Sequence, residues 1–448
     1  MKPTRKSFSA RVASAQHGQV IILMILLVAL GSGFLVYSIA SFRSIDYEKN
    51  AKTDAAMRQA KQALMGWSAA RTPNSTNTTY RPGELPCPDT NNDGVAEFSC
   101  VAGAIGRVPW KTLEIPEPKD GYDETLWYAI SGPFRYKPQA SAPITSDTLG
   151  TLTVYQGSSA TTVTSQAIAV LFAPGPAVGT QARGTASALC STTGTTIAQQ
   201  YCAANYLEST GGGNNAQTNG PFIQAASSAT FNDRVLPITN ADLMPLVEQR
   251  VAVEMMSYLS QYRAAAPTHV YPWADLGDGN SNGNPGTDAY TRGRFPCGTA
   301  SPTDWGSGGT PTLPDWLTNG CDSTSGWAGI IYYAVATNLL ENGGNGCTTP
   351  GCADHSRLNF TNSGFAYLCT YAASPFACRL SSFSSGLTNA VILITPGGWD
   401  GSSHVWSNSA WTTITGYFED AQNGDNNNDT FTLPTSTATN RDRMFIMQ

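Results

Sequence analysis

A long uncharged and strongly apolar segment near the N-terminus is the clearest pattern in the chain. Residues 19–42 contain no charged side chain, and the stretch from Val20 to Leu30 reads VIILMILLVAL. About 20 apolar residues in succession are enough to cross a bilayer as a helix. Basic residues precede this segment, at Lys2, Arg5, Lys6 and Arg11, and basic flanks stay in the cytoplasm. The pattern predicts a single pass through an inner membrane at 19–42, with the C-terminal bulk in the periplasm or at the cell surface.

The helical pattern continues beyond this segment. Between Ser44 and Ala70 there is no proline and only one glycine, Gly66. Apolar residues recur there at intervals of three and four positions, at Ala56, Ala60, Ala63, Leu64 and Trp67. Such spacing places them on one face of an amphipathic helix. We therefore expect one helix over 19–70, whose second half packs on a globular body.

The rest of the chain repeats a set of short blocks in one order. The first copy contains LPCPDTNNDG from Leu85, GRVPW from Gly106, LWYAIS from Leu126, IAVLFAPG from Ile168 and FNDRVLPI from Phe231. The second copy contains YPWADLGDGN from Tyr271, GRFPC from Gly293, IYYAVAT from Ile331, AVILITPG from Ala390 and NRDRMFIM from Asn440. Repetition of this kind indicates related structural units. We expect a first module at 71–238 and a second module at 239–448.

Each module is expected to be a helix followed by a small antiparallel sheet. In the second module, Thr239 and Asp242 form a capping-box signature at the start of a helix over 240–263. Short apolar runs bounded by turn residues, such as Ala390–Thr395, predict strands. The expected fold class is α+β, in which a long N-terminal transmembrane and amphipathic helix packs on a duplicated β-rich head.

The ten cysteines are spaced as couples that lie close in sequence, and none precedes position 87. The couples are Cys87–Cys100, Cys190–Cys202, Cys297–Cys321, Cys347–Cys352 and Cys369–Cys378. We expect five local disulfides, which require an oxidising compartment. Zinc is the alternative, although the chain has no CxxC spacing and few histidines.

Composition narrows the class of protein further. Charged residues make up 13% of the chain, and its 43 glycines and 27 prolines give the turn-rich character of exported β-rich proteins. The net charge of -6, with no basic patch beyond the N-terminal part, argues against nucleic acid as a partner. The four histidines are scattered, and no GxSxG, phosphate loop or dinucleotide fingerprint occurs. We therefore expect a protein that is not an enzyme.

The layout of the N-terminal part resembles the type IV pilin and type II secretion pseudopilin family. Its members have a basic leader ending in glycine, a hydrophobic helix, and a β-rich head on the second half of that helix. The resemblance implies a leader over 1–18, cleavage between Gly18 and Gln19 by prepilin peptidase, and other pilins or pseudopilins as partners of the helix. Two positions depart from the family, which usually has Phe or Met at the first mature residue and Glu at the fifth. Leu23 at the fifth position favours a minor, tip or initiating subunit over a major one, and it equally suits a protein that never enters a filament.

The LPCPD, GRVPW and LWYA blocks are similar to those of large prepilin-like proteins. The resemblance implies a minor subunit of a type IV pilus or type II secretion filament. It would present a large disulfide-stapled extracellular head, with adhesion as a candidate role. One alternative is a permanently membrane-anchored periplasmic or surface binding protein that does not assemble. Another is an ordinary secretory signal peptide that is cleaved near Ala40.

Acidic and amide-rich loops are candidate calcium sites. Asp89, Asn91 and Asp93 place oxygen ligands at alternate positions before the turn residue Gly94, and Glu97 supplies a further carboxylate. The second module offers a looser set at Asp275, Asp278 and Asn280, and residues 425–429 form a third loop. The alternative is that Asp, Asn and Gly only build turns here.

Two further groups of residues are candidates for binding. Trp399, Trp406 and Trp411 lie in a polar stretch of the second module; they either form a surface for a carbohydrate or another ligand, or pack in the interior. The pairs Asp233–Arg234 and Asp442–Arg443 end the two modules. Their arginines either bind a carboxylate or peptide, or hold the last strand of each module to its body.

Overall fold

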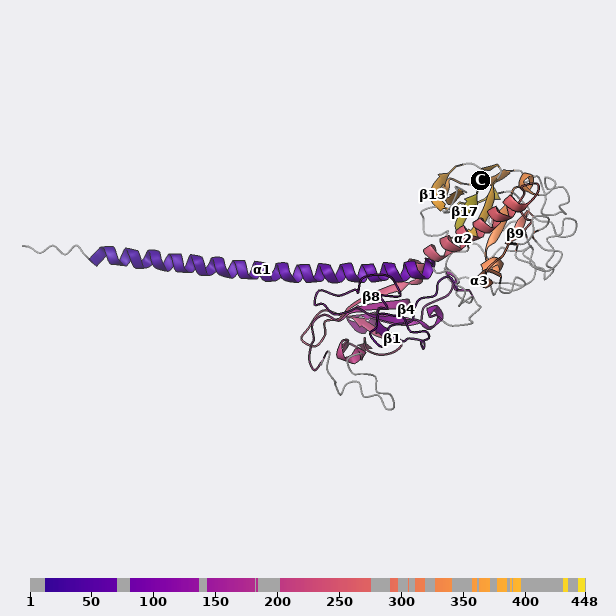
Figure 1. Ribbon diagram of the computed structural model, residues 1–448. Helices are drawn as coiled ribbons and strands as arrows, with labels where there is room; N and C mark the ends of the chain where they lie inside the picture. The colour runs from indigo at the N-terminus through magenta and orange to yellow at the C-terminus, as the bar shows by residue number, and fades with distance from the viewer. Residues whose placement is uncertain are drawn as a thin grey trace, which may run out of the picture.

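The computed structural model contains one long helix and two bodies built on β-sheets (Figure 1). It describes residues 13–70, 81–136, 143–181, 183, 202–274, 291–296, 305, 311–318, 327–340, 357–360, 362–370, 377–384, 387–388, 390–395, 430–433 and 442–447. Within these residues there are three α-helices: α1 (Ala13–Ala70), α2 (Asn240–Ala265) and α3 (Asp315–Thr318). The first body lies against the C-terminal part of α1, and α2 leads from it into the second body.

Two six-stranded sheets form the centres of the two bodies. The first contains β1 (Ile105–Arg107), β2 (Trp127–Ile130), β3 (Leu152–Gln156), β4 (Ser158–Ala173), β7 (Phe222–Gln224) and β8 (Arg234–Thr239). The second contains β9 (Arg292–Arg294), β10 (Tyr332–Val335), β12 (Gly364–Thr370), β13 (Ala377–Phe383), β15 (Val391–Thr395) and β17 (Arg443–Met447). Two smaller sheets are formed by β5 (Ser209–Thr210) with β6 (Gly213–Asn214), and by β11 (Arg357–Phe360) with β14 (Leu387–Thr388) and β16 (Thr430–Phe431).

The expected membrane span is wrong. In the part of the chain that the structure describes, no helix has a stretch long and apolar enough to cross a membrane. The span at 19–42, the transmembrane part of the fold class and the inner-membrane location with a single pass are corrected accordingly.

The expectation of purely antiparallel sheets is also wrong, because both large sheets are mixed. In the first sheet, β3 pairs with β7 in parallel, and in the second sheet β12 pairs with β17 in parallel. Both parallel pairs join strands that are far apart in the sequence. Parallel neighbours need a long crossover connection, and short-range sequence patterns do not reveal them.

Four strands of each sheet nevertheless follow one arrangement. The order β1-β2-β4-β8 in the first sheet corresponds to β9-β10-β15-β17 in the second, and every neighbouring pair within both sets is antiparallel. A tyrosine hydroxyl at the same place in each set donates a hydrogen bond to a proline carbonyl. Tyr128 binds Pro86 at 3.1 Å, and Tyr333 binds Pro272 at 2.8 Å. The repeated sequence blocks therefore form equivalent strands with equivalent contacts.

The C-terminal part of α1 is held by the first body. Met57, Ala60 and Leu64 are almost fully buried and belong to the large apolar cluster of the molecule. A loop of the body also reaches the helix, where the Gly121 N–H donates to the Thr53 hydroxyl at 2.9 Å. The apolar stripe of the amphipathic segment thus supplies the burial, and the loop contacts fix the position of the helix.

A direct strand-to-helix junction joins the two bodies. Strand β8 ends at Thr239 and α2 begins at Asn240, with the Thr239 N–H and hydroxyl each 2.9 Å from the Asp242 carboxylate. The same carboxylate lies 2.8 Å from the Lys61 amine of α1, so the start of α2 is tied to the end of α1. One continuous apolar cluster contains residues of α1, α2 and both sheets. The two bodies therefore share a core.

We predict that Gly121→Ala destabilises the docking of α1. A Cβ at residue 121 would lie 2.3 Å from the carbonyl oxygen of Lys49, which forces the loop away from the helix. The free energy of unfolding should fall by about 1–3 kcal/mol, as measured by denaturant unfolding.

The matched control is Gly66→Ala within α1, where an added Cβ meets nothing within 4 Å. Because alanine favours a helix over glycine, this variant should gain up to about 1 kcal/mol. A Gly121→Ala variant as stable as the Gly66→Ala variant would contradict the proposed docking contact.

Candidate assembly interface and buried acid–arginine contacts

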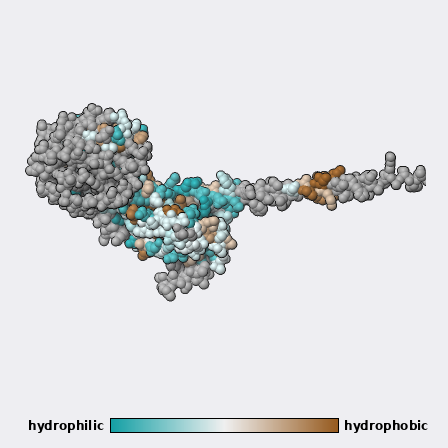
Figure 2. All heavy atoms as spheres, turned by 180° about the vertical axis from the view of Figure 1, so that it is seen from behind, coloured by the Kyte–Doolittle hydropathy of each residue, from teal (hydrophilic) through white to brown (hydrophobic). Residues whose placement is uncertain are grey.

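The candidate functional site is a bare apolar segment of α1, residues 22–30. Every residue in it is exposed, and the exposed fraction of its large side chains runs from 52% at Leu26 to 70% at Val28. At 3.6 residues per turn, nine consecutive residues point in all directions around the helix. Figure 2 shows this segment as an apolar region on the projecting helix, apart from the bodies. Exposed apolar surface that is contiguous in this way marks an interaction site.

The residues predicted for processing and filament contact lie in or near the bare segment. Gly18 and Gln19 lie within α1, which begins at Ala13. Leu23 is 62% exposed and is part of the segment itself. The structure thus places Leu23 on the uncovered surface, while cleavage after Gly18 stays a prediction.

The two Asp-Arg pairs place an arginine against the helix of each module. Arg234, the first residue of β8, forms an ion pair with Asp54 of α1. Arg443, the first residue of β17, forms an ion pair with Glu248 of α2. This arrangement matches the structural interpretation, in which the arginine holds the last strand to the body. The sequence analysis identified the two arginines but not their acidic partners, Asp54 and Glu248. These two acids could have been recognised because they lie at similar distances before the ends of α1 and α2.

Glu248 links the two bodies through a buried set of hydrogen bonds. Its side chain is 1% exposed. It accepts hydrogen bonds from Ser146 in the first module and, at 3.3 Å, from Thr395 in the second. Burial also lowers the pKa of its partner Arg443 to about 10. An ion pair in these surroundings is costly to break, because removing one member leaves an unpaired charge out of water.

Asp233 is part of a second buried acidic contact. One carboxylate oxygen accepts from the Glu208 N–H at 2.8 Å and from the Asn215 amide at 2.9 Å. Glu208 in turn accepts from the Asp233 N–H at 3.0 Å. Burial raises the pKa of Asp233 well above its ordinary value, and the nearby Glu208 charge adds to this. The sequence identified Asp233 but not Glu208, which lies 25 residues earlier.

The predicted calcium loop at Asp89 is closed by its own hydrogen bonds. One Asp89 oxygen accepts from the Asn92 N–H at 2.6 Å and the other from the Gly94 N–H at 2.8 Å. Asn91, Asp93 and Glu97 also accept backbone N–H groups within the loop. Across the described residues, no three His, Cys, Asp or Glu side chains gather as metal ligands. These hydrogen bonds are those of a turn, and calcium binding at this loop stays a prediction.

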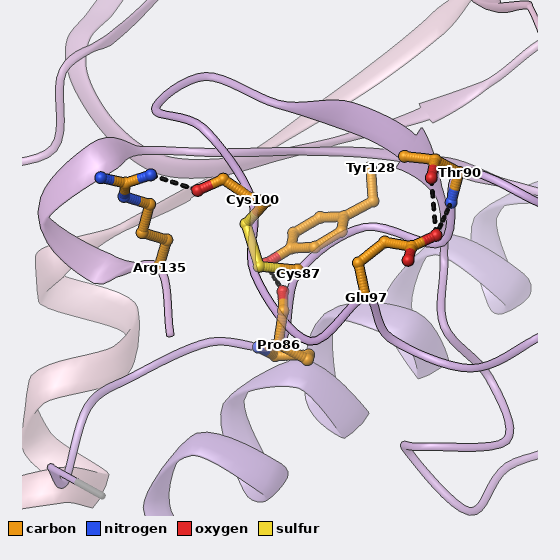
Figure 3. The surroundings of a disulfide bond; sticks show 7 residues. All are labelled: Pro86, Cys87, Thr90, Glu97, Cys100, Tyr128 and Arg135. Carbon is orange, nitrogen blue, oxygen red and sulfur yellow. Dashed lines mark hydrogen bonds between the residues drawn. A yellow bond between two sulfur atoms is a disulfide. The ribbon is translucent and has the colours of Figure 1, made fainter. Parts of the chain in front are cut away.

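The loop is further held by a disulfide, which Figure 3 shows between Cys87 and Cys100. Arg135 donates to the carbonyl of Cys100, and the Thr90 hydroxyl donates to Glu97 at 2.6 Å. The second disulfide, Cys369–Cys378, joins the paired strands β12 and β13. These are two of the five predicted pairs.

Several predicted sites fall outside the described residues. Cys202 is disulfide-bonded, while Cys190 lies outside. The others that lie outside are Cys297, Cys321, Cys347, Cys352, the calcium candidates Asp275, Asp278 and Asn280, the loop 425–429, and Trp399, Trp406 and Trp411.

We predict that Glu248→Ala strongly destabilises the protein. The change leaves the Arg443 guanidinium without its buried partner, and the free energy of unfolding should fall by about 3 kcal/mol or more. Glu254→Ala is the matched control on the same helix, because Glu254 pairs with Arg250 at 3.0 Å near the surface. It should cost less than about 1 kcal/mol. Equal losses in denaturant unfolding would refute the role of Glu248.

A second prediction concerns pH. Because the pKa of Asp233 is raised in the folded state, the folded protein holds its proton while the unfolded chain loses it above about pH 4. The free energy of unfolding should therefore fall as pH rises from there toward neutrality. Asp233→Asn keeps the acceptor oxygen and removes the titration. The free energy of unfolding of this variant should therefore rise with pH relative to that of the unmodified protein. A constant difference across pH in denaturant unfolding would contradict this assignment.

Comparison of the chain with protein-family models, curated proteins and solved structures finds no match.

Proposed function

We propose that this protein is a minor subunit of a filament of the type IV pilin or pseudopilin kind. Its long helix would pack among the helices of other subunits, and its two modules would form the exposed head. The observation that carries the proposal is the bare segment 22–30 of α1, whose apolar side chains are exposed on all sides.

The geometry of this segment favours several neighbours over one. A helix that pairs with a single partner buries a stripe at positions a and d of a heptad. In the segment 22–30, Ile22, Leu23, Met24 and Ile25 follow one another and point in four different directions. Covering all of them requires helices on every side, as in the core of a helical assembly. A helix that is apolar all round is a buried helix.

The division of α1 into two parts also supports a filament subunit. The residues from Lys49 onward contact the first body, through the loop at Gly121 and through the buried face at Met57 and Leu64. The bare segment lies about 30 Å farther toward the N-terminus, at 1.5 Å per residue. One part of the helix thus holds the head, and the other is left for contacts between subunits.

A low-copy position, at the tip or at initiation, agrees with the size of the head. Each helix carries two modules, because α2 and the second sheet follow directly on the first body (Figure 1). Repeated lateral packing of helices brings their heads together, and two modules per helix crowd that packing. Leu23 in place of the glutamate usual in the family agrees with the same position.

We predict that Leu26→Lys removes the protein from filaments. A lysine charge at this place cannot be buried among apolar helices without a partner, so assembly should fail while the head stays folded. The measurement is the amount of protein recovered in sheared filaments from cells that express the variant with the native assembly system, beside the near-ultraviolet circular dichroism of the purified chain.

Leu380→Lys is the control, because Leu380 is also exposed, at 61% against 52% for Leu26, but lies on β13 in the second body. It should leave recovery unchanged. If Leu26→Lys enters filaments as the unmodified protein does, the bare segment is not the assembly surface.

A further inference from the structure

A pocket lies between α1 and the first sheet, at the start of β8. It has a volume of about 410 Å³ and opens to solvent. Its lining comes from three elements: Asp54, Met57 and Arg58 of α1, Gln224 and Ala225 at the end of β7, and Asp233, Arg234, Val235 and Leu236 at and before β8. A volume of this order is typical of small-molecule sites.

Among the described residues, the charges that line the pocket pair with one another except at Arg58. Arg234 pairs with Asp54, so these two side chains largely balance each other. Arg58 is exposed, and it makes no hydrogen bond or ion pair with any side chain that the structure describes. Asp233 is 2% exposed and shares its surroundings with Glu208, which favours its neutral form. The pocket therefore carries a net positive charge at Arg58.

The remaining lining is apolar, with one amide. Met57 and Val235 are mostly buried, and Leu236 and Ala225 are partly exposed beside them. Gln224 adds a donor and an acceptor at the end of β7. A guanidinium next to apolar surface matches a ligand with a carboxylate on a short apolar group, because arginine binds carboxylates through paired N–H groups.

We propose that this pocket binds a carboxylate that carries a short apolar side chain, with the Arg58 guanidinium contacting the anion. The C-terminal residue of a peptide and a free carboxylic acid share this chemistry. The site lies on the head, apart from the bare segment of α1. Binding at this pocket does not depend on whether the protein assembles into a filament.

The test is titration calorimetry of the full chain with three small probes. N-acetyl-leucine presents the free carboxylate, N-acetyl-leucinamide has the same shape without the charge, and acetyl-Ala-Ala-Leu presents the carboxylate at the end of a peptide. We expect N-acetyl-leucine to bind at least about tenfold more tightly than its amide, because a hydrogen bond to a charged group contributes that much affinity. If acetyl-Ala-Ala-Leu binds more tightly than N-acetyl-leucine, the ligand is the C-terminus of a peptide. If the two bind with equal affinity, the ligand is a free carboxylic acid.

Two variants locate the site. Arg58→Gln should weaken binding of N-acetyl-leucine about tenfold or more, and it is expected to fold because Arg58 is exposed and unpaired within the described chain. Arg379→Gln is the control: it removes another exposed arginine, which lies on β13 of the second sheet, and it should leave the affinity unchanged. The proposal is overturned if no carboxylate probe binds, if acid and amide bind equally, or if Arg58→Gln binds as well as the unmodified protein.

Discussion

The structure depends on the packing of one helix against one sheet in each module. Met57, Ala60 and Leu64 bury the inner face of α1, and Leu243, Val247 and Val251 do the same for α2. In each module an arginine at the start of the last strand then forms an ion pair with an acid on that helix. Apolar burial supplies most of the stabilisation, since it is the dominant favourable contribution to folding. The ion pairs add a contact between the last strand of each module and its helix.

Because α2 is both the continuation of β8 and the helix of the second module, the two bodies cannot move independently without disturbing a core. Glu248 receives hydrogen bonds from the first body and from the second, and Lys61 of α1 pairs with Asp242 at the start of α2. The two modules of the head therefore share a core, and the head is attached to the C-terminal part of α1.

The N-terminal part of α1 contrasts with the part that holds the head. Its segment 22–30 exposes apolar side chains all round, whereas nearer the head Lys52 of α1 pairs with Asp123 of the first body at 2.5 Å. The pocket at Arg58 is a second place where the surface is not internally balanced. The first of these surfaces is apolar and the second carries the positive charge of Arg58, so the partners expected at the two surfaces differ in chemistry.

The sequence by itself determined the local elements, and the tertiary structure decided how they meet. The stripe at 56–67, the strands near 127–130 and 391–395, the repeated blocks and the pairs Cys87–Cys100 and Cys369–Cys378 follow from patterns a few residues long. The same reasoning predicted a membrane span, which the described helices do not contain, and at the Asp89 loop it left calcium and a turn as alternatives, of which the structure shows the turn hydrogen bonds. The parallel strands β7 and β17, the partners Asp54, Glu208 and Glu248, and the pocket beside Arg58 join residues that are distant in the chain. Periodicity reports which face of an element is buried but not which other element covers it, so only the folded chain could show them.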